Sequence, residues 1–79
     1  MNDLLSNINK LHTTTMGVTR IKSHLGLYNE DVVAYCKRKI LHKDCHIYKN
    51  GKNWYCEIDN IQITVNSFNY IIITAYKIK

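Results

Sequence analysis

The spacing of apolar residues changes once along the chain, just before Cys45. Upstream of it, apolar side chains recur every three or four residues, which is typical of one face of an α-helix. This spacing predicts helices over residues 3–11, about 17–25 and about 30–43. Gly26 stands where the second helix should end. Asn29 is predicted to cap the third helix, with Glu30 and Asp31 in its first turn, where acidic side chains favour the helix dipole.

The same pattern assigns the apolar stripes that the helices would bury. Asn2 or Asp3 is expected to cap the first helix. Basic side chains crowd the end of the third helix, where positive charge also favours the dipole. They are Lys37, Arg38, Lys39, His42 and Lys43. The predicted stripes are Leu4, Leu5, Ile8 and Leu11 in the first helix, Ile21 and Leu25 in the second, and Val32, Val33, Cys36, Ile40 and Leu41 in the third.

From Cys45 onward the period becomes two residues, which is typical of β-strands that bury one face. Asn50-Gly51 and Asp59-Asn60 are two-residue turn signals between three such strands. The turns predict these cross-strand pairs: Ile47 with Trp54, Cys45 with Cys56, Ile58 with Ile61, Cys56 with Ile63, and Trp54 with Val65. Both hairpins then place one apolar set on the same face: Cys45, Ile47, Trp54, Cys56, Ile58, Ile61, Ile63 and Val65.

The connection to the last strand leaves two arrangements open. A three-residue connection, Ser67-Phe68-Asn69, would add Ile71, Ile73 and Ala75 to the apolar face. A four-residue connection would turn the last strand over and exchange its faces. The opposite face of the sheet is polar and aromatic. It would hold His46, Tyr48, Asn53, Tyr55, Glu57, Gln62, Thr64, Asn66, Tyr70, Ile72, Thr74 and Tyr76.

An apolar helix stripe and an apolar sheet face each need a partner, so the helices are expected to pack on that face. The predicted fold class is α+β, with N-terminal helices packed on one face of a four-stranded antiparallel meander sheet. The 79 residues form a single domain, 1–79, with helices over about 3–43 and the sheet over about 45–78. Nothing in the chain is then left to cover the other face of the sheet.

Composition limits the classes of partner and the cellular compartment in which the protein is expected. Eleven Lys+Arg against six Asp+Glu give a formal net charge of +5, and seven of the basic residues lie in 1–43. This charge permits nucleic-acid or acidic protein partners, or serves solubility alone. Three cysteines without a CxxC pair indicate free thiols in a reducing compartment. No segment approaches the roughly 20 apolar residues of a membrane span. We therefore predict a cytoplasmic protein without membrane association, either a monomer or a homodimer that pairs through its long apolar last strand.

No motif for catalysis, a cofactor or a metal ion stands out. His42, Cys45 and His46 are close in sequence, but the strand pleat would point Cys45 inward and His46 outward. A buried thiol such as that of Cys36 is usually inert. A metal-independent ribonuclease needs a base, an acid and a cation. The chain holds such side-chain types in His46, Tyr55, Thr74, Tyr76, Lys52 and Arg20. No His–Glu pair is expected at paired positions, so no catalytic residue, metal ligand or cofactor is predicted.

Six segments carry a family resemblance: LHTT (11–14), GVTRIK (17–22), DVV-Y-CK-KI (31–40), GKNWY (51–55), ITVN (63–66) and IITAYKIK (72–79). In this order they resemble a small family of uncharacterised bacterial and phage-borne proteins, a domain of unknown function. The resemblance covers nearly the whole chain and transfers no catalytic residue. The order of helices and strands also resembles the barnase–colicin–RelE group of ribonuclease toxins, at the level of fold alone. Small, basic, single-domain proteins of this kind are similar to anti-CRISPR inhibitors, some of which target RNA-guided RNA nucleases.

Two functions from different classes follow. The first is a non-enzymatic binding protein that inhibits or modulates a nucleic-acid-handling effector, as an anti-CRISPR inhibitor does; its partner would be a Cas effector or the RNA complex of that effector. The second is a metal-independent ribonuclease toxin-like or RNA-binding domain, because exposed tyrosines can stack on bases. Exposed tyrosines also suit protein interfaces, and they are common in strands that bind nothing. The predicted partner-binding residues are Tyr48, Lys52, Tyr55, Thr64, Thr74, Tyr76, Lys37 and Arg38.

Overall fold

Helices and strands form two layers in the computed structural model, which describes residues 3–78. The elements are α1 (Asp3–Ser6), a 3-10 turn (Ile8–Lys10), α2 (Thr15–Leu25), α3 (Val32–Leu41), β1 (His46–Asn50), β2 (Asn53–Ile58), β3 (Ile61–Asn66) and β4 (Ile72–Lys77). The strands are antiparallel and lie in the order β1-β2-β3-β4. The α+β meander predicted from the sequence is therefore confirmed.

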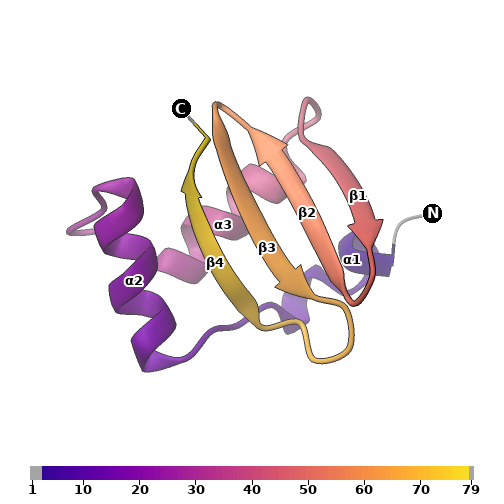
Figure 1. The fold of residues 1–79 in the computed structure, drawn as a ribbon, viewed down its shortest axis with the longest axis horizontal. Coiled ribbons are helices and arrows are strands. Elements are labelled where there is room, and N and C mark those ends of the chain that lie inside the picture. Colours follow the sequence, from indigo (N-terminus) through magenta and orange to yellow (C-terminus); the bar gives the residue numbers. More distant parts are fainter. Residues whose placement is uncertain (1–2, 79) are drawn as a thin grey trace.

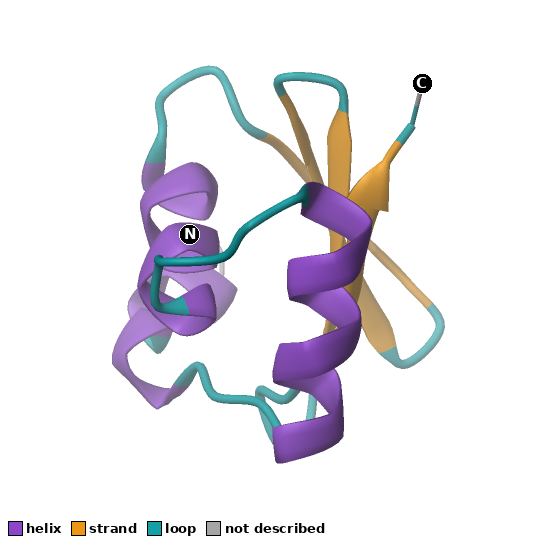
Figure 2. Ribbon diagram, turned by 90° about the vertical axis from the view of Figure 1, so that its left-hand side faces the viewer, coloured by secondary structure: helices purple, strands orange, loops and turns teal. Residues whose placement is uncertain are grey.

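The helices leave one face of the sheet open. In Figure 1, α1 and α3 lie behind the sheet, and α2 runs along β4 at its edge. The view turned by 90° shows α3 and the N-terminal turn on one side of the strand layer, and no described helix covering the opposite face (Figure 2). Among residues 3–78, no helix covers the face of the sheet that points to the viewer in Figure 1. We call this surface the outer face.

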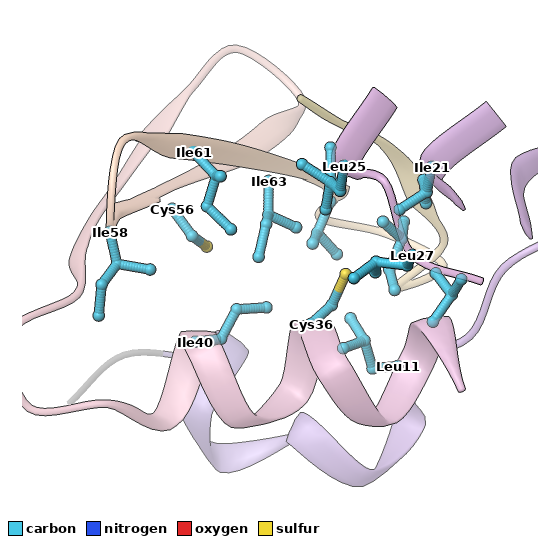
Figure 3. Packing of buried hydrophobic residues seen from close by; sticks show 14 of the residues in the cluster. Leu11, Ile21, Leu25, Leu27, Cys36, Ile40, Cys56, Ile58, Ile61 and Ile63 are labelled. Carbon is cyan, nitrogen blue, oxygen red and sulfur yellow. The ribbon is translucent and has the colours of Figure 1, made fainter. Parts of the chain in front are cut away.

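The core fills the space between the inner face of the sheet and the helices. Cys36 and Ile40 of α3 point toward Cys56 and Ile63 of the sheet (Figure 3). Ile63, on the inner strand β3, has 0% of its surface exposed. The predicted apolar face is confirmed, because each of its eight members is buried or packs against the buried cluster.

Helix α2 begins and ends with the expected residue types. The Thr14 side chain accepts a hydrogen bond from the backbone N–H of Gly17 at 3.0 Å, which satisfies one free donor of the first turn. Gly26 ends the helix in the left-handed region, with φ of 69°. A side chain larger than glycine adopts that φ with strain, so glycine is favoured at this end.

The start predicted for α3 is wrong. Asp31, and not Asn29, caps this helix, because its Oδ1 accepts from the backbone N–H of Ala34 at 3.0 Å. Glu30 and Asp31 therefore precede the first turn instead of forming part of it. Val32, Cys36 and Ile40 are buried as predicted, whereas Leu41 is exposed, because the helix ends there and its side chain lies beyond the sheet-facing stripe.

The first predicted helix is interrupted. Residues 3–11 form the short α1 and a separate 3-10 turn, since the Asn7 side chain donates to the Asp3 carbonyl at 2.9 Å and competes with the helical pattern. Leu4 and Leu11 are buried and Ile8 is half-buried, but Leu5 is exposed, against the prediction. A cap at Asn2 lies outside the described residues.

The first hairpin has a different turn from the one predicted. Asn50 pairs with Asn53, so the turn residues are Gly51 and Lys52, and Ile47 faces Cys56 instead of Trp54. Gly51 has φ of 65°, a backbone conformation that suits glycine at the first turn position. The shift in pairing is two residues, an even number, so every side chain stays on its predicted face.

The second hairpin matches its prediction. Asp59 and Asn60 have φ of 53° and 63°, the left-handed pair of a type I′ turn. Ile58 pairs with Ile61 in the register that this turn fixes. The pairs Cys56 with Ile63 and Trp54 with Val65 follow from it and are also confirmed.

The last strand follows neither predicted arrangement. Its register shifts at a bulge between the pairs of Thr64 and Val65, so that Ile72 and Ala75 both belong to the core. Ile72 is 1% exposed and Ile73 is 38% exposed, the reverse of the faces that the three-residue connection would give, whereas the burial of Ala75 agrees with that connection. The extra residue of a bulge changes the alternation of faces along a strand, which a turn length cannot reveal.

A longer connection accompanies this bulge. It spans residues 67–71, and Tyr70 adopts a left-handed φ of 61°. Asn66 Oδ1 accepts from the backbone N–H groups of Phe68 and Asn69 and holds the bend. Tyr70 was predicted to lie on the outer face. It packs against the core instead.

Candidate functional site

The outer face presents its side chains in three cross-strand rows. Because strands alternate their faces and pair directly, residues on one face line up across the sheet. The rows are His46, Glu57, Gln62 and Tyr76; Tyr48, Tyr55, Thr64 and Thr74; and Asn50, Asn53 and Asn66. Figure 1 shows this face of the sheet toward the viewer. One mixed polar row with a single carboxylate, one aromatic and hydroxyl row and one amide row thus form a surface that can exchange many hydrogen bonds.

The middle row is the best-ordered part of this surface. The rings of Tyr48 and Tyr55 are stacked, with 5.4 Å between centroids and 23° between planes. Thr64, next in the row, is buried although it points away from the core. It therefore offers little of its own surface to a partner. Tyr55 is half-buried and Tyr48 is exposed, which leaves ring surface available to a partner.

Glu57 links the first two rows. The Tyr48 hydroxyl donates a hydrogen bond to Glu57 Oε2 at 3.1 Å, and this bond raises the pKa of Tyr48 above its usual value. The ring of His46 lies 5.3 Å from that of Tyr48. The hydroxyl bond and the ring contact together favour one orientation of the Tyr48 side chain in the free protein.

A His–Glu pair exists on this face, contrary to the sequence prediction. His46 and Glu57 are direct cross-strand partners. The prediction missed them because the assumed turn at Asn50-Gly51 placed His46 opposite Tyr55. No hydrogen bond joins the two side chains, and Glu57 is engaged by Tyr48 instead.

The charge of the outer face distinguishes between partner classes. Its strand positions hold one carboxylate, Glu57, and no Lys or Arg. Binding to RNA draws much of its affinity from cations that neutralise phosphates. The aromatic, hydroxyl and amide groups present instead are of the kinds found in wet, polar protein interfaces.

The structure separates the eight predicted binding residues into three groups. Five lie together on the outer face: Tyr48, Tyr55, Thr64, Thr74 and Tyr76. Lys52 occupies the exposed turn between β1 and β2, at the end of the amide row. Lys37 and Arg38 lie on α3, which packs behind the sheet (Figure 1). The two surfaces that the sequence suggested are thus on opposite sides of the molecule.

The basic end of α3 is partly neutralised. Arg38 pairs with Glu30 at 3.2 Å, and Lys39 pairs with Asp59 at 2.6 Å. The second pair raises the pKa of Lys39, lowers that of Asp59 and ties the helix to the β2–β3 turn. Lys37 makes no ion pair with any residue among 3–78, so it remains available to an anionic group.

The described part of the chain holds no metal-binding cluster, and two of its three thiols are buried. Cys36, Cys45 and Cys56 are free, and burial raises the pKa of the Cys36 thiol to about 12. Burial also raises the pKa of Cys56, so both thiols stay protonated near neutral pH. No group of three or more His, Cys, Asp or Glu side chains within residues 3–78 has the geometry of a metal site.

Sequence reasoning missed two surface features. Phe68 is 74% exposed and sits on the bend that Asn66 holds, near the amide row. The sequence does contain a signal for this feature, namely an aromatic residue within a segment rich in turn-forming residues. The second is a shallow groove of about 320 Å³, away from the outer face. It is lined by Thr13, Val18, Lys22, Glu30, Asp31, Val32 and Val33.

The groove is a weaker candidate than the outer face. Its two carboxylates already have partners, since Glu30 pairs with Arg38 and Asp31 caps α3. Only Lys22 remains as a charged group to orient a ligand. The outer face therefore stays the candidate site.

The fold and this face define a small α+β domain with one open face on a four-stranded antiparallel sheet. A family model described as "Protein of unknown function (DUF3781)" matches residues 5–76. The chain therefore belongs to this uncharacterised family, so the expectation of a domain of unknown function is confirmed. No curated protein and no solved structure matches the chain. Among residues 3–78, every helix is too short or too polar to cross a membrane.

Proposed function

We propose that this protein is a non-enzymatic binding protein that holds a protein partner on its outer face. The supporting observation is the stacked and hydrogen-bonded group of Tyr48, Tyr55 and Glu57 on a sheet face that no described helix covers. Tyrosines that are oriented before binding lose little conformational freedom on association, which favours affinity. The lack of lysine and arginine at the strand positions of this face favours a protein over an RNA ligand.

We further propose that the partner is a nucleic-acid-handling effector, which the protein inhibits in the manner of an anti-CRISPR protein. An effector loaded with guide RNA offers both a protein surface and phosphates. The outer face suits the first, and Lys37 on α3 suits the second. The small size and the net charge of +5 agree with this proposal.

The direct experiment is a binding and inhibition assay with purified Cas effectors from the host range of the protein. Each effector is tested with and without guide RNA, across a series of salt concentrations. We expect binding that changes less than about tenfold between 0.1 and 0.5 M salt, because one phosphate contact, at Lys37, accounts for only about fourfold. Failure to bind or inhibit any effector contradicts the proposal, and a steep loss with salt shows that phosphate contacts dominate instead.

The His46–Glu57 pair supports a second candidate, a metal-independent ribonuclease. An imidazole and a carboxylate are the groups that general acid–base catalysis uses, and Tyr76 lies in the same row. Incubation of total RNA with the protein in EDTA distinguishes the two functions. Under our first proposal the RNA stays intact. Cleavage that is lost in His46→Ala, but kept in the matched control His24→Ala, would establish the ribonuclease.

A further inference from the structure

The two edges of the sheet are not equivalent. Along β4, the free edge is occupied near its start, where the His12 N–H donates to the Tyr70 carbonyl and the His12 carbonyl accepts from the Ile72 N–H at 2.8 Å. The Thr13 hydroxyl also donates to the Ile72 carbonyl at 2.9 Å. Helix α2 runs beside this strand (Figure 1). The β4 edge, which the sequence favoured for pairing between copies, is thus already in use.

The β1 edge has no such cover within residues 3–78. Asn50 and Asn53 close a two-residue hairpin, so this pair is hydrogen-bonded, and bonded pairs recur at every second residue. The N–H and C=O groups of His46 and Tyr48 therefore face β2, and those of Ile47 and Lys49 face outward. No other described element bonds to Ile47 or Lys49. The strand also lacks proline and a bulge, two features by which proteins protect an edge.

We propose that a second copy of this chain pairs with β1, antiparallel, to form a continuous eight-stranded sheet. Only the outward residues can bond across the edge, which leaves three symmetric registers. Pairing Lys49 with Lys49 of the second copy sets Ile47 opposite Gly51, which lies in the turn beyond the strand with φ of 65° and does not continue the extended ladder. Pairing Ile47 with Ile47 also requires the N–H of Cys45, which already donates to the His42 carbonyl at 3.0 Å. Pairing Ile47 with Lys49 uses every outward donor and acceptor, so the proposal commits to this register.

This register places Tyr48 on the two-fold axis, opposite itself. In a non-hydrogen-bonded antiparallel pair of this kind, the two Tyr48 Cα atoms lie about 4.5 Å apart, so the two side chains can touch. The stacked Tyr48 and Tyr55 of each copy then form one aromatic row across the dimer. Lys49 does not block the approach, because its ammonium group lies 5.8 Å from the Trp54 ring, on the inner side of the sheet.

The dimer should be weak. Two five-residue edges bury much less than the roughly 1,200 Å² of a standard stable interface. Association is therefore expected over protein concentrations of about 10 µM to 1 mM. Sedimentation velocity on the purified protein, with no partner present, should show the mass rising from 9.3 kDa toward twice that value over this range.

Two sets of variants test the edge and its register. Lys49→Pro removes one outward N–H without touching a bond to β2, and should hold the protein at 9.3 kDa. The matched control Lys49→Ala keeps the N–H and should still dimerise. Tyr48→Lys and Tyr48→Asp should each be monomeric, because like charges meet on the axis, while an equimolar mixture should recover the dimer.

Three results would overturn the proposal. They are a wild-type mass that stays at 9.3 kDa at the highest concentration, a Lys49→Pro variant that is folded by circular dichroism and still dimeric, and a charge-swapped mixture that remains monomeric. The Tyr48 variants keep the proposal testable if Lys49→Pro does not fold. None of these measurements depends on the effector partner, so their outcome is independent of the proposed function.

Discussion

Ile63→Ala is expected to lower the free energy of unfolding by about 3–4 kcal/mol, because it leaves a cavity in the most enclosed part of the core. Ile63 has 0% of its surface exposed and lies on an inner strand between Cys56 and Ala75. Figure 3 shows it facing the side chains of α3. A domain of this size derives only roughly 3–5 kcal/mol from its core, so much of the variant should be unfolded at 25 °C.

The matched control is the adjacent residue on the other face. Gln62 is half-buried and belongs to the first row of the outer face. Gln62→Ala should change the free energy of unfolding by about 0.5 kcal/mol or less, as surface substitutions usually do. Urea denaturation followed by the fluorescence of Trp54 measures both variants. Equal effects of the two substitutions would contradict the assignment of faces.

The face on which each residue lies could be predicted, because a register error of an even number of residues leaves every side chain on the same face. The first hairpin was predicted two residues out of register, yet Cys45, Ile47 and Trp54 still lie on the inner face. The turn at Asp59-Asn60 was predicted correctly, since only a few residue types adopt two consecutive left-handed conformations.

The last strand could not be predicted, because its arrangement depends on contacts distant in sequence. The bulge that buries Ile72 accompanies a bond from its N–H to His12, which lies 60 positions earlier. The left-handed φ of Tyr70 likewise carries no local sequence signal of the kind that glycine or asparagine gives. Strict alternation therefore cannot bury both Ile72 and Ala75, which lie three positions apart.

The candidate site was predictable to a similar extent. Alternation places Tyr48, Tyr55 and Thr64 on one face of the sheet, and the structure confirms that face; that Tyr48 lies directly opposite Tyr55 was not predicted. The His46–Glu57 pair was missed because direct pairing, unlike the choice of face, requires the correct register. That Lys37 lies on the opposite side follows only from the packing of α3 against the inner face.

Tyr55→Ala should weaken binding of the protein partner by about 30-fold, or about 2 kcal/mol, if the outer face is the binding surface. Tyr55 is central to the middle row, stacked on Tyr48 and paired with Thr64. Its removal takes away its own contact area and also the support that orients Tyr48. Truncation usually weakens binding most at residues near the centre of an interface, and tyrosine is one of the residue types most frequent among them.

A second tyrosine provides the matched control. Tyr28 is 80% exposed and lies between α2 and α3, away from the outer face. Tyr28→Ala removes the same side chain and should leave affinity within about twofold, as expected for a residue outside an interface. Isothermal titration calorimetry against an effector that binds the wild type measures both variants, after circular dichroism has shown that each is folded. Loss of affinity in Tyr28→Ala with none in Tyr55→Ala would move the binding surface to the helical side. A loss confined to Lys37→Ala would do the same, and would point to phosphate contacts at the basic end of α3.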